Sequence, residues 1–209
     1  MKHIMQFGDS NTWGYAPGSD GDRLPRETRI CGAMQAELGG GFRVIEEGLN
    51  GRTTVFDDPM FDNRCGKSHL PMLLESHAPL DLVSIMLGTN DLKHFFHLSV
   101  VDIALGASTL VEIVQESDTG PNGEAPRVLL VSPPLVTDPD AFAPQFAGAR
   151  EKSSEFRQHY SDMAAQLGCG FFDAATVTEV PTPDGVHLDA ASAARLGRAL
   201  ADKIRTMLV

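Results

Sequence analysis

Short apolar runs alternate with longer amphipathic segments along the chain. The short runs fall at residues 3–7, 42–46, 81–87, 127–132 and 170–173, and several are rich in β-branched side chains. Residues 81–87 are almost continuously apolar, as expected of a central strand buried on both faces. The alternation predicts an α/β domain with a mainly parallel, five-stranded sheet.

The longer segments repeat apolar residues at helical spacing. In the first of them, Ile30, Ala33, Met34 and Leu38 form one stripe, and three consecutive glycines follow it. The chain of 209 residues shows no internal repeat and no flexible linker, so we expect a single domain over residues 1–209. Helices are predicted over residues 27–38, 68–77, 102–116, 151–167 and 190–208.

Three loops with polar or glycine-rich chemistry each follow a predicted strand. Ser10 follows the first strand, Asn50 and Gly51 follow the second, and Asn90 follows the third. Loops after parallel strands gather at one edge of a sheet, where ligands bind. We therefore expect these residues to share a site.

Ser10 is the candidate nucleophile of that site. Gly8 permits a sharp turn after the first strand, and a helix that begins at Ser10 would surround the serine oxygen with free backbone N–H groups. The alternative is an ordinary turn in which Asp9 or Ser10 caps a helix.

Asp184 and His187 lie three residues apart between the last predicted strand and the last predicted helix. Asp184 can accept from one ring nitrogen of His187 while the other faces Ser10, so that His187 acts as general base. Alternatively, Asp184 forms a turn and His187 lies on the surface.

Acyl transfer also requires donors for an oxyanion. The backbone N–H groups of Ser10 and Gly51 and the side-chain amide of Asn90 are suitable. Each segment is compatible with a plain turn as well. The order Ser, Gly, Asn, Asp-x-x-His favours the catalytic interpretation.

The order of these residues resembles the GDSL or SGNH hydrolases, named after the serine, glycine, asparagine and histidine of four motif blocks. The resemblance implies a flavodoxin-like three-layer α/β/α sandwich, a catalytic triad, an oxyanion hole and no cofactor. The triad would be Ser10, His187 and Asp184, and the hole Ser10, Gly51 and Asn90. The blocks read Gly8-Asp9-Ser10-Asn11, Gly48-Leu49-Asn50-Gly51, Gly88-Thr89-Asn90-Asp91 and Asp184-Gly185-Val186-His187.

Further segments are similar to the bacterial arylesterase and acyltransferase branch of this family. They are Thr12-Trp13-Gly14, Ile45-Glu46-Glu47-Gly48-Leu49, Arg52-Thr53-Thr54 and Ile85-Met86-Leu87. This resemblance implies hydrolysis of short-chain acyl esters, transfer of acyl groups to alcohols or hydrogen peroxide, and a homo-oligomer such as an octamer. An acyl-CoA thioesterase and a non-catalytic phosphate-binding module are the alternatives.

Four residues are candidates for substrate binding: Asn11, Trp13, Arg52 and Val186. Asn11 stands where the family usually has leucine, so we expect a more polar pocket edge that favours esters of polar alcohols. Trp13 would stack on a ligand ring or pack against the first helix. Arg52 would bind a substrate carboxylate or organise the second loop through Asp57 or Asp58.

Two further segments have open interpretations. Asp91, His94 and His97 suggest a metal site, but histidines beside Phe95 and Phe96 also suit a pocket wall, and we predict no metal. Residues 135–150 contain prolines and expose Phe142 and Phe146, so they would cover the site or form an oligomer interface.

Charge and cysteine content limit the partners. The net charge of -11 and the pI near 4.9 disfavour nucleic acid and anionic membranes, which leaves a small ester as the expected substrate. Three widely separated cysteines argue against a disulfide framework. No apolar run reaches the length of a signal-peptide core or a membrane span, so we expect a cytoplasmic protein.

Overall fold

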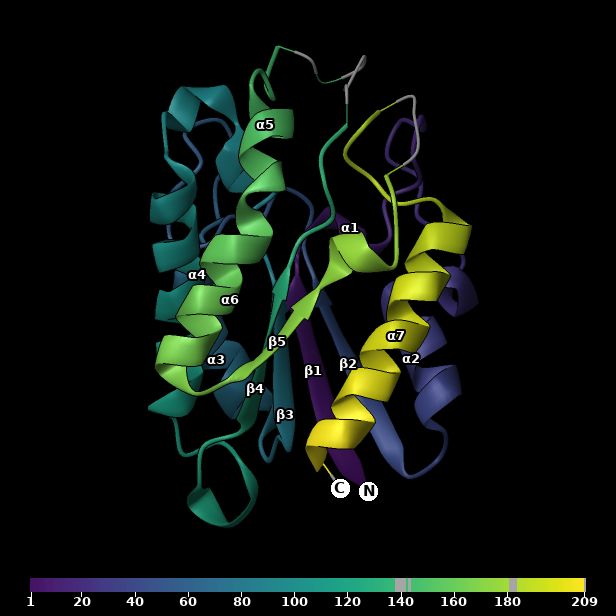
Figure 1. The fold of residues 1–209 in the computed structure, drawn as a ribbon. Helices are drawn as coiled ribbons and strands as arrows, with labels where there is room; N and C mark the ends of the chain where they lie inside the picture. Colours follow the sequence, from purple (N-terminus) through teal and green to yellow (C-terminus); the bar gives the residue numbers. More distant parts are fainter. Residues whose placement is uncertain (138–141, 143, 181–183, 209) are drawn as a thin grey trace.

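The computed structural model describes residues 1–137, 142, 144–180 and 184–208. Within them, five parallel strands form one sheet in the order β2-β1-β3-β4-β5 (Figure 1). The strands match the predicted positions to within two residues: the first two are longer than predicted, and the third is one residue shorter at each end. They are β1 Lys2–Gly8, β2 Phe42–Gly48, β3 Leu82–Met86, β4 Arg127–Ser132 and β5 Gly170–Asp173.

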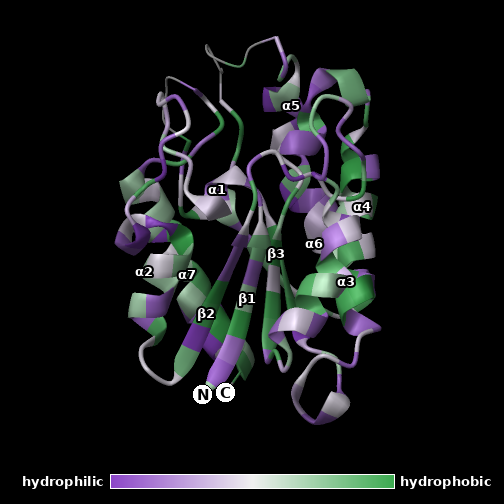
Figure 2. Cartoon of the chain, turned by 180° about the vertical axis from the view of Figure 1, so that it is seen from behind, coloured by the Kyte–Doolittle hydropathy of each residue, from purple (hydrophilic) through white to green (hydrophobic). Residues whose placement is uncertain are grey.

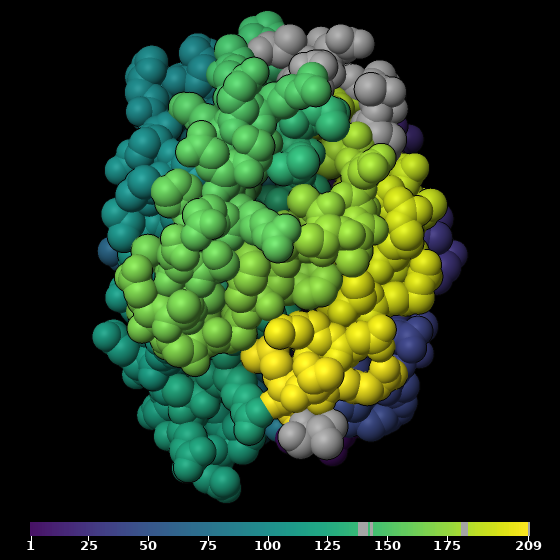
Figure 3. Space-filling view, viewed as in Figure 1, coloured from purple at the N-terminus to yellow at the C-terminus, as the bar shows by residue number. Residues whose placement is uncertain are grey.

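Helices cover both faces of the sheet, which gives the predicted three-layer α/β/α sandwich. One face carries α2 (Ile30–Leu38) and α7 (Ala190–Leu208). The other carries α3 (Gly66–His77), α4 (Val100–Gln115) and α6 (Phe156–Leu167). The space-filling view has the orientation of Figure 1, and in it α6 and α7 cover much of the side that faces the reader (Figure 3).

Shorter helical segments surround the carboxyl ends of the strands. Two are α1 (Ser10–Trp13) and α5 (Ala149–Ser154). Single 3-10 turns on this side lie at Arg26–Thr28, Asn90–Leu92, His94–Phe96 and Ala174–Thr176, whereas the turn at Pro121–Gly123 precedes β4 at the opposite end of the sheet. None of the helices in the described part of the chain is long and apolar enough to cross a membrane.

The core is divided by the sheet into two apolar clusters, as alternation along a strand requires. On β1, Ile4 packs with α2 and α7, whereas Met5 and Phe7 pack with the helices of the opposite face. All five residues of β3 are buried, and the strand is largely apolar (Figure 2). This central strand therefore anchors the loop that carries Asn90.

The predicted helix over residues 151–167 is divided into α5 and α6 at Glu155. The hydroxyl groups of Ser153 and Ser154 donate to the backbone carbonyls of Arg150 and Glu151. Such bonds compete with regular helical hydrogen bonds, and here they accompany the interruption. The predicted helix over residues 27–38 begins at Ile30, preceded by a 3-10 turn.

Candidate active site

Ser10 begins α1 immediately after β1, so the sheet fixes its position. The side chain of Asp9 caps this helix by accepting from the backbone N–H of Asn11 at 3.0 Å. Gly8 is required at the turn, because a Cβ there would lie 2.1 Å from Oγ1 of Thr12. The strand-turn-helix unit predicted from the sequence therefore presents Ser10 at the carboxyl edge of the sheet.

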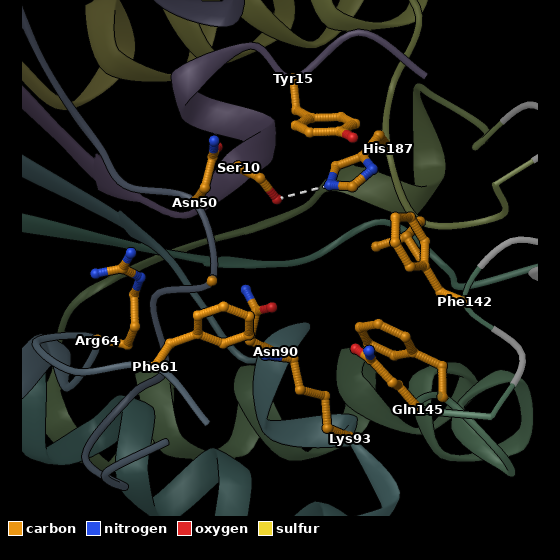
Figure 4. Close-up of a pocket in the computed structure, with 13 residues that line it drawn as sticks. Ser10, Tyr15, Asn50, Phe61, Arg64, Asn90, Lys93, Phe142, Gln145 and His187 are labelled. Atoms are coloured by element: carbon orange, nitrogen blue, oxygen red, sulfur yellow. Dashed lines mark hydrogen bonds between the residues drawn. The ribbon is translucent and has the colours of Figure 1, made fainter. Parts of the chain in front are cut away.

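Ser10, His187 and Asp184 form a continuous chain of hydrogen bonds. The Oγ atom of Ser10 lies 2.9 Å from Nε2 of His187 (Figure 4), and Nδ1 of His187 lies 3.0 Å from Oδ2 of Asp184. All three side chains are buried. The structure brings together the three residues predicted for a triad, with the imidazole oriented for proton transfer to or from Ser10.

Asp184 is held ionised by its surroundings. Burial by itself raises the pKa of Asp184, but hydrogen bonds from the His187 ring and from the backbone outweigh it and lower the pKa below its usual value. The backbone donors are the N–H groups of Val186 and His187, at 3.0 and 2.8 Å from Oδ1. An ionised Asp184 favours a proton on Nδ1 of His187 and leaves Nε2 free to accept from Ser10.

Two aromatic rings contact the imidazole of His187. Tyr15 stacks on it with ring centroids 4.2 Å apart and an interplanar angle of 28°. Phe142 meets it edge to face, at 5.9 Å and 79°. Sequence reasoning missed Tyr15, since nothing in the pattern of the first loop indicates a contact with a residue so distant in the chain.

The predicted oxyanion donors converge beside Ser10. Gly51 adopts a φ of +79°, a conformation that favours glycine, and lines the same cavity as Ser10 and Asn90. The side-chain amide of Asn90 donates to the backbone carbonyl of Arg52 at 3.1 Å, which orients it and leaves its second N–H for a ligand. The arrangement supports the predicted oxyanion hole.

Asp91 fastens the loop of Asn90 to the loop of Gly51. Its Oδ1 atom accepts from the backbone N–H of Thr54 at 3.0 Å and from the Thr54 hydroxyl at 2.5 Å. Burial raises the pKa of Asp91 to about 6, although the bonds from Thr54 oppose the shift. Burial likewise raises the pKa of Asp9 to about 6, against the hydrogen bond from Asn11.

The structure assigns Arg52 to the scaffold of the site. Its Nη1 atom donates to the carbonyls of Gly8 at 2.9 Å and Glu47 at 2.5 Å, and its guanidinium lies over the ring of Phe7. Burial lowers the pKa of Arg52 to about 10. Arg52 therefore organises the second loop as one alternative predicted, but through backbone carbonyls rather than through Asp57 or Asp58.

Two of the expected substrate contacts require correction. The Asn11 side chain is buried and binds the backbone of Val186 and Leu188, so it does not form the edge of the pocket. Trp13 lies outside the pocket as well, and the guanidinium of Arg23 covers its ring at 4.7 Å. Val186, the remaining candidate, does line the pocket.

The pocket is a cavity of about 290 Å³ that opens beside Ser10. Phe61, Phe142, Phe146 and Val186 supply apolar walls, as is usual for small-molecule sites. Phe146 is only 6% exposed, so the expectation that it is exposed is wrong. Residues 138–141 and 143 of the expected interface segment lie outside the described residues.

Amide and cationic side chains complete the pocket wall. Asn50 and Gln145 contribute amides, and Arg64 and Lys93 contribute positive charges (Figure 4). Of these four, the sequence motifs drew attention only to Asn50. The others belong to loops without a recognisable pattern, so only their placement in space reveals them.

The histidines considered for a metal site lie apart from Asp91. His94 and His97 are exposed, whereas the Asp91 carboxylate is buried and bound to Thr54. Across the described ranges, no group of three or more histidine, cysteine or acidic side chains is arranged to hold a metal ion.

Comparison with known proteins agrees with this geometry. A carbohydrate acetylesterase from Sinorhizobium meliloti is 42% identical over 99% of this chain and all of that one, with a TM-score of 0.96. An aryl esterase from M. smegmatis is 43% identical over the full length of both chains, with a TM-score of 0.95. A lipase/acylhydrolase from Enterococcus faecalis, 21% identical over 100% of this chain and 98% of that one, shares the fold with a TM-score of 0.71.

No curated protein sequence matches the chain. Residues 7–195 match the GDSL-like lipase/acylhydrolase family. This range includes Ser10, His187 and Asp184. The two closely similar esterase structures match 99% and 100% of the chain and have the same fold. The protein is therefore a serine ester hydrolase that belongs to the GDSL-like lipase/acylhydrolase family.

Proposed function

We propose that the protein hydrolyses short-chain acyl esters, acetyl esters above all, of aryl, alkyl or carbohydrate alcohols. The observation that carries the proposal is the hydrogen-bonded chain from Ser10 through His187 to Asp184 at the mouth of the pocket. The similarity to a carbohydrate acetylesterase and to an aryl esterase supports the choice of alcohols.

In the proposed acylation, Ser10 Oγ attacks the carbonyl carbon of the ester while its proton moves to Nε2 of His187. The carbonyl oxygen becomes negatively charged and accepts from the N–H groups of Ser10, Gly51 and Asn90. The bond to the alcohol oxygen then breaks, and His187 returns the proton to that oxygen. The acyl group remains on Ser10 as an ester.

In the proposed deacylation, a water molecule attacks the acyl carbon and His187 accepts its proton. The bond to Ser10 Oγ breaks, Oγ recovers the proton from His187, and the carboxylic acid leaves. An alcohol or hydrogen peroxide in place of water would yield a new ester or a peracid. Such transfer is part of the proposal, because the same residues would activate either acceptor.

The size of the pocket supports short acyl groups. A cavity of about 290 Å³ has to hold both halves of the ester, and three phenylalanines occupy its walls. An aryl or sugar alcohol leaves room for a small acyl group.

The substrate class is tested by kcat/KM for phenyl acetate, phenyl octanoate, an acetylated xylose and acetyl-CoA. We expect the acetyl esters to react fastest and Ser10→Ala to lose about six orders of magnitude in kcat. A preference for acetyl-CoA over both acetyl esters would instead support the thioesterase alternative. Absence of turnover by folded protein on all four substrates would contradict the proposal and favour a binding module.

We also propose a cytoplasmic location and a homo-oligomer such as an octamer. The described cysteines, Cys31, Cys65 and Cys169, are all free thiols, which suits a reducing compartment. Leu135, in the segment predicted as an interface, is 44% exposed and available for a subunit contact. Light scattering tests the assembly, and a monomer at micromolar concentration would contradict it.

A further inference from the structure

The described wall of the pocket is positively charged in an acidic protein. Arg64 and Lys93 line it, and no aspartate or glutamate does so among the described residues. The chain as a whole has a formal net charge of -11. This local excess of positive charge is not required for the hydrolysis of a neutral ester.

Lys93 is already neutralised within the protein. Its Nζ atom lies 2.7 Å from Oδ2 of Asp58, and both side chains are almost fully buried. In a buried ion pair each charge already has its partner. If Lys93 turned to a substrate, the buried carboxylate of Asp58 would be left without one. The charge available to a ligand is therefore that of Arg64.

Arg64 is paired only with neutral groups. Its Nη1 atom donates to the backbone carbonyls of Asp62 at 2.8 Å and Asn63 at 3.2 Å. Over the ranges that the structure describes, no carboxylate forms an ion pair with it. A guanidinium has five N–H donors in a planar fork, and these two bonds share Nη1, so Nε and Nη2 keep their donors.

The side chain of Arg64 lies against the oxyanion loop, on one wall of the pocket. A Cβ on Gly51 would lie 3.5 Å from both Cδ and Nε of Arg64, so the arginine stem covers the oxyanion loop. Arg64 and His187 lie on opposite sides of the pocket (Figure 4). An ester bound at Ser10 would therefore have Arg64 near one of its ends.

We propose that Arg64 binds a carboxylate carried by the ester, so that the preferred substrates are anionic short-chain esters. The inference rests on the proposed function and specifies its substrate class. A guanidinium and a carboxylate form two parallel charge-assisted hydrogen bonds, which a neutral ester cannot provide. The carboxylate belongs either to the acyl group or to the alcohol.

Three substrates and three variants test the inference. Phenyl acetate is neutral, phenyl hemisuccinate carries the carboxylate on the acyl group, and 4-acetoxybenzoate carries it on the alcohol. Arg64→Met removes the charge but keeps a stem over Gly51, whereas Arg64→Lys keeps the charge and loses the fork. Arg26→Gln is the matched control, since it removes one exposed arginine outside the pocket.

We expect Arg64→Met to lower kcat/KM for at least one of the two anionic esters about tenfold or more beyond its effect on phenyl acetate. Arg64→Lys should recover part of the loss, and the loss should shrink in 1 M salt. The anionic ester that responds identifies which half of the substrate Arg64 contacts. Arg26→Gln should leave all three values within twofold.

An equal loss on all three esters, or no loss on either anionic ester, would overturn the inference. An equal loss would assign Arg64 to loop structure through its bonds to the carbonyls of Asp62 and Asn63. In both cases, turnover of phenyl acetate by the wild type, and its absence in Ser10→Ala, would leave the proposed esterase function standing. The two proposals therefore fail separately.

Discussion

Asn11 holds the backbone on both sides of His187. Its Nδ2 atom donates to the carbonyl of Val186 at 3.1 Å, and its Oδ1 atom accepts from the N–H of Leu188 at 2.8 Å. Asn11 follows Ser10 directly, so one residue of the first block fixes the loop that carries the imidazole. The distance between Ser10 and His187 therefore depends on a side chain that does not line the pocket.

Asn11→Leu should weaken the site without changing its selectivity. The substitution leaves a buried N–H and a buried carbonyl without their partner, at a cost of about 1–3 kcal/mol each. We expect a lower free energy of unfolding and about tenfold lower kcat/KM, by the same factor for phenyl acetate and an acetylated sugar. A change in the ratio of the two specificity constants would instead assign Asn11 to substrate binding.

Asn90→Ala should reduce kcat by roughly two to three orders of magnitude, as expected when one oxyanion donor is removed. KM should change little, since the donor acts mainly in the transition state. The amide also binds the carbonyl of Arg52, so thermal unfolding of the variant serves as the structural control. Activity close to that of the wild type would exclude Asn90 from the oxyanion hole.

Tyr15 should act on kcat through the orientation of His187. An aromatic pair of this geometry contributes about 0.5–1.5 kcal/mol. Tyr15→Leu should therefore lower kcat several-fold, whereas Tyr15→Phe keeps the ring and loses only the hydroxyl bond to the Ser19 carbonyl. Equal kinetics for the two variants would show that the stacked ring does not matter.

Asp91 should make the protein less stable as the pH rises from about 4 to 6. Its folded pKa of about 6 lies above its usual value of 3.8, so in this window the folded state binds more protons than the unfolded state. The free energy of unfolding contributed by Asp91 falls by up to roughly 3 kcal/mol across the window. Asp9, whose pKa is also raised to about 6, adds to the same trend.

Urea unfolding at several pH values measures this effect. In Asp91→Asn the free energy of unfolding should decline less steeply between pH 4 and 6.5, because the amide oxygen still accepts from Thr54 and no longer titrates. Asp102→Asn is the control: hydrogen bonds from Ser99 lower the pKa of Asp102, so it titrates below this window. An unchanged slope in Asp91→Asn would contradict the buried, titrating state of Asp91.

The sheet could be predicted from the sequence because each strand is a short apolar run between polar loops. The hydrogen-bonded arrangement of Ser10, His187 and Asp184 could be predicted because Ser10 closely follows a strand and because Asp184 and His187 are close in the chain. The role of Asn11 could not be predicted from the sequence. Successive helical residues point about 100° apart, so Ser10 faces the pocket while Asn11 faces the histidine loop.

Contacts between individual loop side chains were equally inaccessible from the sequence. Tyr15 reaches His187 because parallel strands bring their following loops to one edge. Arg64 covers Gly51 because the loop between β2 and α3 folds back on itself. The sequence predicts which loops meet, but it does not indicate which side chains in them touch. Arg64 and Tyr15 therefore emerge only from the arrangement in space.

We propose that His187 and Asp184 activate Ser10 as the nucleophile. Labelling with a fluorophosphonate, followed by peptide mass spectrometry, tests it directly. We predict one label on the peptide that contains Ser10, none there in Ser10→Ala, and much slower labelling in His187→Ala. Absence of labelling in folded wild-type protein, or a label that persists in Ser10→Ala, would contradict the account.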